Sequence, residues 1–140
     1  MSSAKNIETD VPSILKKDGV EENDLFDVNH ETVNLEKILA DKPKDTSWSK
    51  RIIDSENNSM TIIAQLPGEG NRRHYHPDWN EWWFIVQGSW LWEVDGTTRS
   101  VNKGDIVFVR RNRVHMITAT GTEMAIRMAV SRADVEHVYV

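Results

Sequence analysis

The sequence predicts an all-β domain, an antiparallel sandwich or barrel, that follows a less regular N-terminal extension. From residue 48 onward, short apolar segments rich in β-branched and aromatic residues alternate with turn signals. Six or more short strands at nearly even spacing are typical of these folds. Asp95-Gly96, between two alternating segments, is a strong signal for a β-hairpin. The strand segments are expected at 60–66, 81–87, 89–94, 105–109, 114–119 and 123–130.

The extension is expected to span residues 1–47, and the β domain residues 48–140. Within the extension, residues 32–40 carry apolar side chains at nearly helical spacing. Asn34 or Thr32 could cap the first turn. A short helix is therefore expected there.

The first 31 residues or so are polar and acidic, which predicts disorder or a loosely docked arm. Few apolar side chains are available to offset the entropy cost of ordering this segment. A few exceptions could fasten the arm onto the barrel or onto a second subunit, and they are Ile14, Leu15, Val20, Leu25 and Phe26.

Composition excludes several classes of protein. At 140 residues the chain suits one domain, and its formal net charge of -5 argues against a nucleic-acid partner held by a general basic surface. No run approaches the roughly 18 apolar residues of a membrane-spanning helix. The N-terminus lacks the apolar core of a signal peptide, so a cytoplasmic location is expected. Without cysteine, a metal would have to be bound by histidine and carboxylate side chains.

Tryptophan is concentrated in one part of the chain. Five of the six tryptophans lie between residues 79 and 92, and residues 82–86 are apolar at every position. Successive strand residues point to opposite faces, so both faces of this strand should be covered. One face would be the barrel interior, and the N-terminal arm or a second subunit could cover the other. A homodimer is expected, with an intramolecular cover as the competing interpretation.

Four residues form a candidate metal site. His74 and His76 are two residues apart, which on a strand places both imidazoles on one face, about 7 Å apart at the backbone. Glu81 begins the next strand, and His115 would come from a strand across the barrel. Three neutral nitrogen donors and one carboxylate leave one or two positions open for water, oxygen or substrate. Such a set suits Fe(II), Mn(II), Ni(II), Zn(II) or Cu(II), and the sequence does not choose among them.

The competing interpretation of these residues is structural. A single His-x-His occurs often by chance, and a lone histidine on an apolar strand is usually a hydrogen-bonded core residue. Three of the five histidines nevertheless fall at these places, with an acid at a suitable distance. The other two, His30 and His137, lie near the ends and are interpreted as surface residues.

The segment from Gly68 to Gly88 resembles the first motif of the cupin superfamily. The spacing Gly-x5-His-x-His-x4-Glu-x6-Gly is filled at every position, with His74, His76 and Glu81 in place. The resemblance covers about residues 60–130.

The second cupin motif is matched less completely. Gly104 and His115 are in register, whereas Arg110 replaces the usual proline, Asn112 the usual glycine and Ala119 the usual asparagine. Asparagine tolerates a left-handed backbone, so Asn112 can take the place of the turn glycine.

The resemblance implies a conical double-stranded β-helix, the jelly-roll cupin barrel. It also implies that one divalent metal ion is held by His74, His76, Glu81 and His115. Dimerisation is frequent in the superfamily.

Arginine and tryptophan supply candidate substrate-binding residues. Arg72 lies four residues before His76, Arg127 interrupts an apolar strand, and Arg113 lies just before His115. Arginine suits bidentate binding of a carboxylate or phosphate. A surface position is the alternative for each. Trp83 shares a strand face with Glu81 and could form part of the pocket wall, although filling the barrel is its more common role.

The first functional hypothesis is a mononuclear non-haem iron dioxygenase that acts on a small carboxylate-bearing substrate, with Fe(II) favoured. The segment YHPDWNEWWFIVQG resembles the ligand segment of 3-hydroxyanthranilate dioxygenases, in which an arginine four residues before the ligand histidine binds the substrate carboxylate. Arg72 takes that position here. The chain departs from that family at His74, where the family has aspartate, and by one residue fewer between histidine and glutamate. The likeness therefore extends to the class only.

The second hypothesis is non-oxidative chemistry, with the metal as a Lewis acid in an isomerase or lyase acting on a small sugar or acid. Sugar-phosphate isomerases and dimethylsulfoniopropionate lyases of the cupin type belong to this group. The lyases are expected to carry a tyrosine two residues after the glutamate ligand, where this chain has Trp83. A third hypothesis is a ligand-binding cupin without catalysis, because one fold supports many functions.

Overall fold

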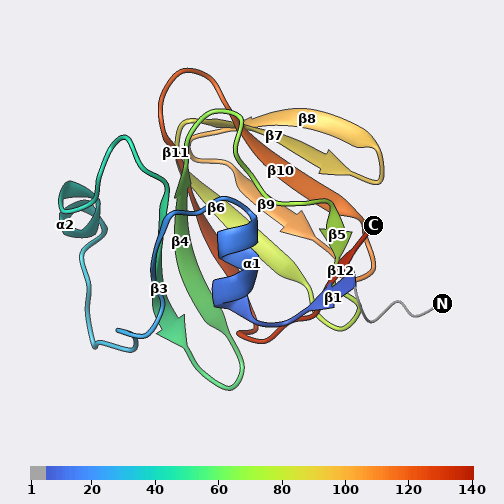
Figure 1. The fold of residues 1–140 in the computed structure, drawn as a ribbon, viewed down its shortest axis with the longest axis horizontal. Coiled ribbons are helices and arrows are strands. Elements are labelled where there is room, and N and C mark those ends of the chain that lie inside the picture. The colour runs from blue at the N-terminus through green and yellow to red at the C-terminus, as the bar shows by residue number, and fades with distance from the viewer. Residues whose placement is uncertain (1–5) are drawn as a thin grey trace.

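The computed structural model of the protein describes residues 6–140 and contains two six-stranded sheets that face each other (Figure 1). The first sheet has the strand order β1-β12-β5-β10-β7-β8. The bounds of its strands in that order are Ile7–Glu8, His137–Tyr139, His74–Tyr75, His115–Thr120, Ser89–Val94 and Thr97–Asn102.

The second sheet has the order β2-β3-β4-β11-β6-β9, and all of its neighbours pair antiparallel except β2 and β3. Its strands span Glu22–Asp24, Trp48–Asp54, Ser59–Gln65, Ala125–Ser131, Glu81–Gln87 and Ile106–Val109. All six strands expected from the sequence are therefore present, within two residues at each end. The strands β1, β2, β3, β8 and β12 were not among the expected segments. The two helices are α1, Val11–Lys17, and α2, Leu35–Ala40. Among the described residues, no helix has the length and apolar character that crossing a membrane requires.

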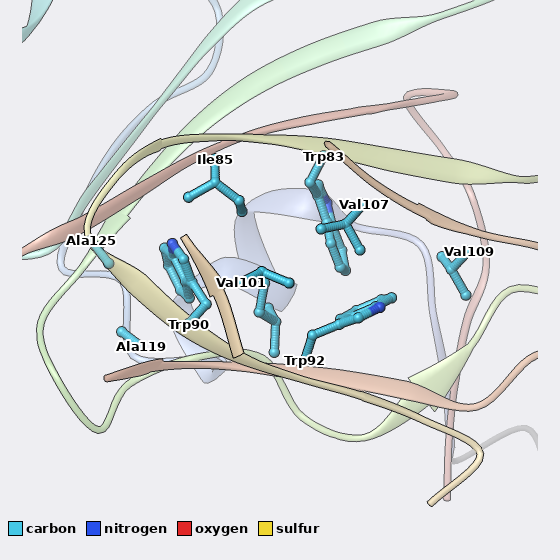
Figure 2. Packing of buried hydrophobic residues seen from close by; sticks show 10 residues of the cluster. Trp83, Ile85, Trp90, Trp92, Val101, Val107, Val109, Ala119 and Ala125 are labelled. Carbon is cyan, nitrogen blue, oxygen red and sulfur yellow. The ribbon is translucent and has the colours of Figure 1, made fainter. Parts of the chain in front are cut away.

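Apolar side chains from both sheets fill the barrel interior. Figure 2 shows Trp83 and Ile85 of β6 pointing toward Trp90 and Trp92 of β7. The rings of Trp83 and Trp92 meet edge to face, with centroids 4.8 Å apart. Alternation explains this arrangement, because the inward residues of each strand are apolar and large enough to span the gap between the sheets.

The turn between β7 and β8 has the backbone conformation that its sequence predicts. Asp95 and Gly96 both have positive φ, 48° and 84°, as a tight hairpin between β7 and β8 requires. Gly70 is needed for a different reason, since a Cβ there would lie 2.0 Å from the carbonyl oxygen of Ile117. The absence of a side chain lets the loop before β5 pack directly on β10, and this contact fixes where β5 begins.

The N-terminal arm packs against the barrel from residue 6 onward and is partly helical, which agrees with the docked arm of the two expected alternatives. Ile14, Leu15, Val20 and Leu25 are buried, whereas Phe26 is 84% exposed. The arm docks because its few apolar residues fall on one side of α1 and of the chain that follows. Helix α1 lies across the front of the barrel in Figure 1.

The side of the barrel that the arm covers also differs from the expectation. Leu15, Val20 and Leu25 pack on Ile63 and Ala129, which are inward-facing residues of β4 and β11. The arm therefore closes the mouth of the barrel and does not cover the outer face of β6.

Helix α2 covers part of the outer face instead. It begins after Asn34, whose side chain accepts a hydrogen bond from the backbone N–H of Lys37 at 3.0 Å, as the capping residue was expected to do. Its apolar residues pack against the buried cluster that contains Ile62 and Ile126, and Val86 near the end of β6 packs against the same cluster. Helix α2 therefore covers part of the outer face of the barrel, but Trp82 does not belong to the cluster on which it packs.

An apolar patch stays exposed where β6 pairs with the edge strand β9. Trp82 lies opposite Phe108, and Phe84 opposite Ile106. Trp82, Phe108 and Ile106 are 42%, 54% and 70% exposed. Exposed apolar side chains on an edge strand are typical of an association surface, so a second copy of the chain over this patch stays our prediction.

We expect the protein to sediment as a dimer and Phe108→Lys to shift it toward the monomer. A buried charge in place of an apolar ring should weaken association by roughly tenfold to a hundredfold. Phe26→Lys is the matched control, because Phe26 is more exposed but lies in the arm. A wild-type monomer at tens of micromolar would contradict the prediction, as would a Phe108→Lys dimer of unchanged stability.

Candidate metal centre

The four predicted ligands come together at one end of the barrel. His74 lies on β5, His76 just after it, Glu81 at the start of β6 and His115 at the start of β10. One ligand atom from each lies within 4.8 Å of all the others. The three histidines are buried. Antiparallel pairing explains the meeting, because His115 lies directly opposite His74 in the ladder.

Backbone carbonyls orient all three imidazoles. Nδ1 of His74, His76 and His115 lies 2.6, 2.9 and 2.9 Å from a carbonyl oxygen. A carbonyl oxygen can only accept, so each Nδ1 carries a proton and donates it. Nε2 therefore keeps its lone pair in the neutral rings of His74 and His115, whereas Nε2 of His76 donates to Glu81 until a metal ion displaces its proton. Metal-binding histidines are held in this way in proteins. The accepting carbonyls belong to Arg72, Glu136 and Arg113, respectively.

The cluster fits a divalent metal ion. Among residues 6–140, Nε2 of His115 is buried and has no hydrogen-bond partner. A carboxylate oxygen of Glu81 lies 3.8 Å from it and 2.9 Å from Nε2 of His76. A buried acceptor without a donor costs free energy unless something binds it. A cation among these lone pairs and this carboxylate would satisfy all of them.

Burial determines the charge states of the ligands. It lowers the pKa of His74 well below its ordinary value and lowers the pKa of His115 to about 4. For Glu81, burial works in favour of the neutral acid, but the hydrogen bond from His76 and the nearby imidazoles outweigh it and hold the pKa at about 2. The site therefore presents an ionised carboxylate and two neutral imidazoles near neutral pH, which is the state that metal binding requires.

Neighbouring residues hold two of the ligands in place. The indole Nε1 of Trp83 donates to the second carboxylate oxygen of Glu81 at 3.1 Å. The backbone N–H of Asn112 donates to the carbonyl oxygen of His76 at 2.7 Å. Asn112 has a φ of 69°, so it adopts the left-handed conformation that its place in the second motif predicts.

A cavity beneath α1 opens onto the cluster. His74 and Glu81 form one part of its wall, and Trp83 and Arg127 form another. Helix α1 closes it with apolar side chains and with Asp18 at its end. Of the predicted substrate-binding residues, the structure brings Arg127 and Trp83 to this cavity.

Arg127 is a buried cation with few partners. It is 3% exposed, and its guanidinium donates one hydrogen bond, 2.7 Å long, to the side-chain oxygen of Gln65. It lies over the ring of Trp90, 4.7 Å from the centroid. Among the described residues, no carboxylate lies within ion-pair distance of it and its Nε has no acceptor. Burial lowers its pKa to about 10, so it is still protonated at neutral pH.

Arg72 does not line the cavity, contrary to the expectation. Its guanidinium pairs with Asp18 at 2.8 Å and with Glu8 at 3.1 Å, and it donates to the hydroxyl of Tyr139 at 2.9 Å. These partners come from the arm and from β12, which the sequence did not place near Arg72. With its donors occupied, Arg72 fastens the arm to the barrel, and a role in binding substrate does not fit this arrangement.

Arg113 also lies outside the cavity in which the sequence interpretation placed it. Its side chain is half exposed and pairs with Asp95 in the β7–β8 hairpin. Although it is only two residues from His115, alternation and the turn direct it toward solvent. It does not reach the cavity.

Two cavity residues were missed. His137, expected at the surface, lies on β12 with its ring stacked on that of His74, with centroids 4.8 Å apart. Burial lowers its pKa to about 4.

Arg51 lines the cavity as well, but its Nε donates a hydrogen bond to the hydroxyl of Thr61 at 3.1 Å and its guanidinium lies near Asp54. No local pattern marks either residue, because short C-terminal strands and single charges in strands are common on surfaces. His30 is exposed, as expected.

The family follows from the match of this segment to known domains. The model of the cupin domain family matches residues 62–131, which contain both motifs and all four candidate ligands.

The chain belongs to the cupin family.

Solved structures agree with this assignment at the level of the fold. A Klebsiella pneumoniae protein with a double-stranded β-helix domain superposes with a TM-score of 0.63 at 17% identity, covering 76% of this cupin and 92% of that chain. The polyketide cyclase RemF from Streptomyces resistomycificus gives 0.63 at 15%, with coverages of 80% and 87%. A putative sugar phosphate isomerase from Acidithiobacillus ferrooxidans gives 0.62 at 15%, with coverages of 71% and 73%. No curated protein matches this cupin.

We expect His76→Ala and His115→Ala each to lose most of the bound metal. Removing one of four donors leaves the metal ion with one bond fewer and an incomplete coordination geometry. Elemental analysis of the purified variants measures the loss, and His30→Ala, exposed and far from the site, is the control. Full metal content in either ligand variant would refute the ligand assignment.

Metal affinity is expected to decline as pH falls from neutral, chiefly through His76. Burial opposes the charged form of His76, but the hydrogen bond and charge of Glu81 outweigh it and raise its pKa. Below that raised pKa a metal ion must displace a proton, so affinity falls by about tenfold per pH unit. His74 and His115 add to the loss only under much more acidic conditions, because their pKa values are lowered. Competition with a chelator measures this, and constant affinity down to about pH 5 would argue against the assignment.

Proposed function

We propose that this cupin is a metal-dependent enzyme that acts on a small anionic molecule. The observation that carries the proposal is the composition of one cavity wall. His74 and Glu81 present the candidate metal site to the cavity, and Arg127 presents a buried cation to it without an ion-pair partner in the described chain.

A buried guanidinium without a carboxylate at ion-pair distance is unfavourable in a resting fold, because the loss of its hydration is only partly compensated. Such a group is retained where a ligand supplies the missing anion. Arginine binds carboxylate or phosphate with two parallel hydrogen bonds. The neighbouring charges of Asp18 and Glu81 favour the protonated form of Arg127. Arg51 is less available, since Thr61 and Asp54 already engage it.

For the reaction, we propose dioxygenation at a mononuclear Fe(II) ion. Three neutral nitrogen donors and one carboxylate suit Fe(II) and leave positions for substrate and oxygen. Bound iron would supply oxygen activation. The residues of the chain would then position the substrate: Arg127 holds its anionic group, and Trp83 fixes the orientation of Glu81. Helix α1 excludes water from the cavity, which strengthens these electrostatic contacts.

A non-oxidative isomerase or lyase is the second candidate. Two observations favour it. Arg72, which carried the likeness to 3-hydroxyanthranilate dioxygenases, is bound to Asp18 and Glu8. The fold also resembles that of a putative sugar phosphate isomerase. In that case the metal would serve as a Lewis acid on a carbonyl or hydroxyl group.

Metal analysis together with oxygen consumption distinguishes the two candidates. The protein is purified without added metal, its metal content is measured, and oxygen uptake is followed on a panel of small carboxylates. We expect iron and substrate-dependent uptake. Zinc or manganese with no uptake on any member would reject the dioxygenase, and product formation without oxygen would support the second candidate.

The anion site is tested in the same assay with Arg127→Met, which keeps an apolar side chain of similar length. We expect KM for the active carboxylate to rise by roughly tenfold to a hundredfold, because a charge-assisted pair in a buried site is lost. Metal content should not change. Arg113→Met, in which a solvent-facing arginine is replaced, is the matched control. An unchanged KM in Arg127→Met would remove the anion site from the proposal.

A further inference from the structure

His137 resembles the ligand histidines in its hydrogen bonding, although it belongs to the strand β12, outside the matched family segment. Its Nδ1 lies 3.0 Å from the carbonyl oxygen of Val135. The carbonyl accepts, so Nδ1 carries the proton and Nε2 of the neutral ring is an acceptor. No hydrogen bond joins this Nε2 to another residue of the described chain.

The fold fixes this ring beside the metal site. β12 pairs with β5, so His137 stacks nearly parallel on His74, at an interplanar angle of 19°. It meets His76 edge to face, with centroids 4.5 Å apart. His137 lines the same cavity as His74 and Glu81. It is not one of the four residues whose ligand atoms all lie within 4.8 Å of one another, so it adjoins the ligand set without belonging to it.

The cavity therefore offers two unpaired hydrogen-bonding groups of opposite kind. Arg127 offers N–H donors that require an acceptor, and His137 offers a nitrogen acceptor that requires a donor. The same cavity wall also carries apolar side chains, among them Ile14 and Leu15 of α1 and Ile63 of β4. A ligand that satisfies both groups carries an oxyanion at one end, a donor at the other and a short apolar body.

We infer that the substrate is a small hydroxy acid whose acid group pairs with Arg127 and whose hydroxyl group, next to the metal, donates a hydrogen bond to Nε2 of His137. A hydroxyl suits this place, because its oxygen can face the metal ion while its hydrogen is donated to Nε2 of His137. The inference rests on the proposed function and names the substrate class of that site. His137 is then a substrate-contacting residue that selects for the hydroxyl.

The test compares matched acids on zinc-loaded protein, in which redox turnover does not consume the probe. Calorimetric titration measures the binding of glycolate against acetate, lactate against propionate, mandelate against phenylacetate, and salicylate against benzoate. We expect at least one hydroxy acid to bind about tenfold tighter than its partner, the effect of one hydrogen bond to a buried acceptor.

Variants of His137 separate this role from packing. His137→Phe keeps a stacked ring without an acceptor, and we expect the preference for the hydroxy acid to fall below about threefold at unchanged zinc content. His137→Gln provides an amide oxygen as acceptor and should retain part of the preference. His30→Phe is the control and should bind both acids as the wild type does.

Three outcomes would overturn the inference: no hydroxyl preference in any pair, full preference in His137→Phe, or loss of zinc from that variant, which would place His137 among the ligands. Binding of both members of a pair with equal affinity would leave the anion site of the proposed function intact. Binding of neither member in every pair would contradict the proposed function itself.

Discussion

The burial of four ligand groups at one end of the barrel is the constraint on which the rest of the structure depends. Three imidazoles and a carboxylate within 4.8 Å are stable only if each proton and lone pair is assigned. The fold does this with backbone carbonyls from three separate segments, each of which accepts a hydrogen bond from Nδ1 of His74, His76 or His115. Asn112 and Gly70 are loop residues without a proposed catalytic role. The residue type at each position is nevertheless constrained, because the loops place these carbonyl groups or the strands that carry them.

The N-terminal arm completes the site and is more than an appendage. Its apolar residues close the mouth of the barrel, and Asp18 at the end of α1 contributes to the cavity wall. Arg72 connects this lid to the centre in two ways, since its side chain binds Asp18 while its backbone carbonyl orients His74. A displacement of the arm would therefore reach the metal site through one residue.

The ionisable groups that line the cavity or lie near it fall into two sets, those with partners within the chain and those with an atom left without one. Arg72 and Arg51 have partners within the chain, whereas Arg127 and His137 each keep a hydrogen-bonding atom without one. Unsatisfied groups cost stability. Their location on one cavity beside the four candidate metal ligands is the reason to propose a functional role for them.

The sequence by itself determined the strand pattern, the hairpin at Asp95-Gly96, the four candidate ligands and the left-handed turn at Asn112. These features depend on alternation, turn chemistry and spacing, which are local. The tertiary structure alone decided which arginines face the cavity, that the arm covers the mouth, and that His137 stacks on His74. These features depend on partners that are distant in the chain; those of Arg72 and Arg127, for example, lie 54 to 67 residues away. An arginine lies at the surface, fastens two segments together or offers an anion site, depending on which carboxylates the fold brings close to its guanidinium. The distance between the guanidinium and those carboxylates cannot be inferred from the local sequence.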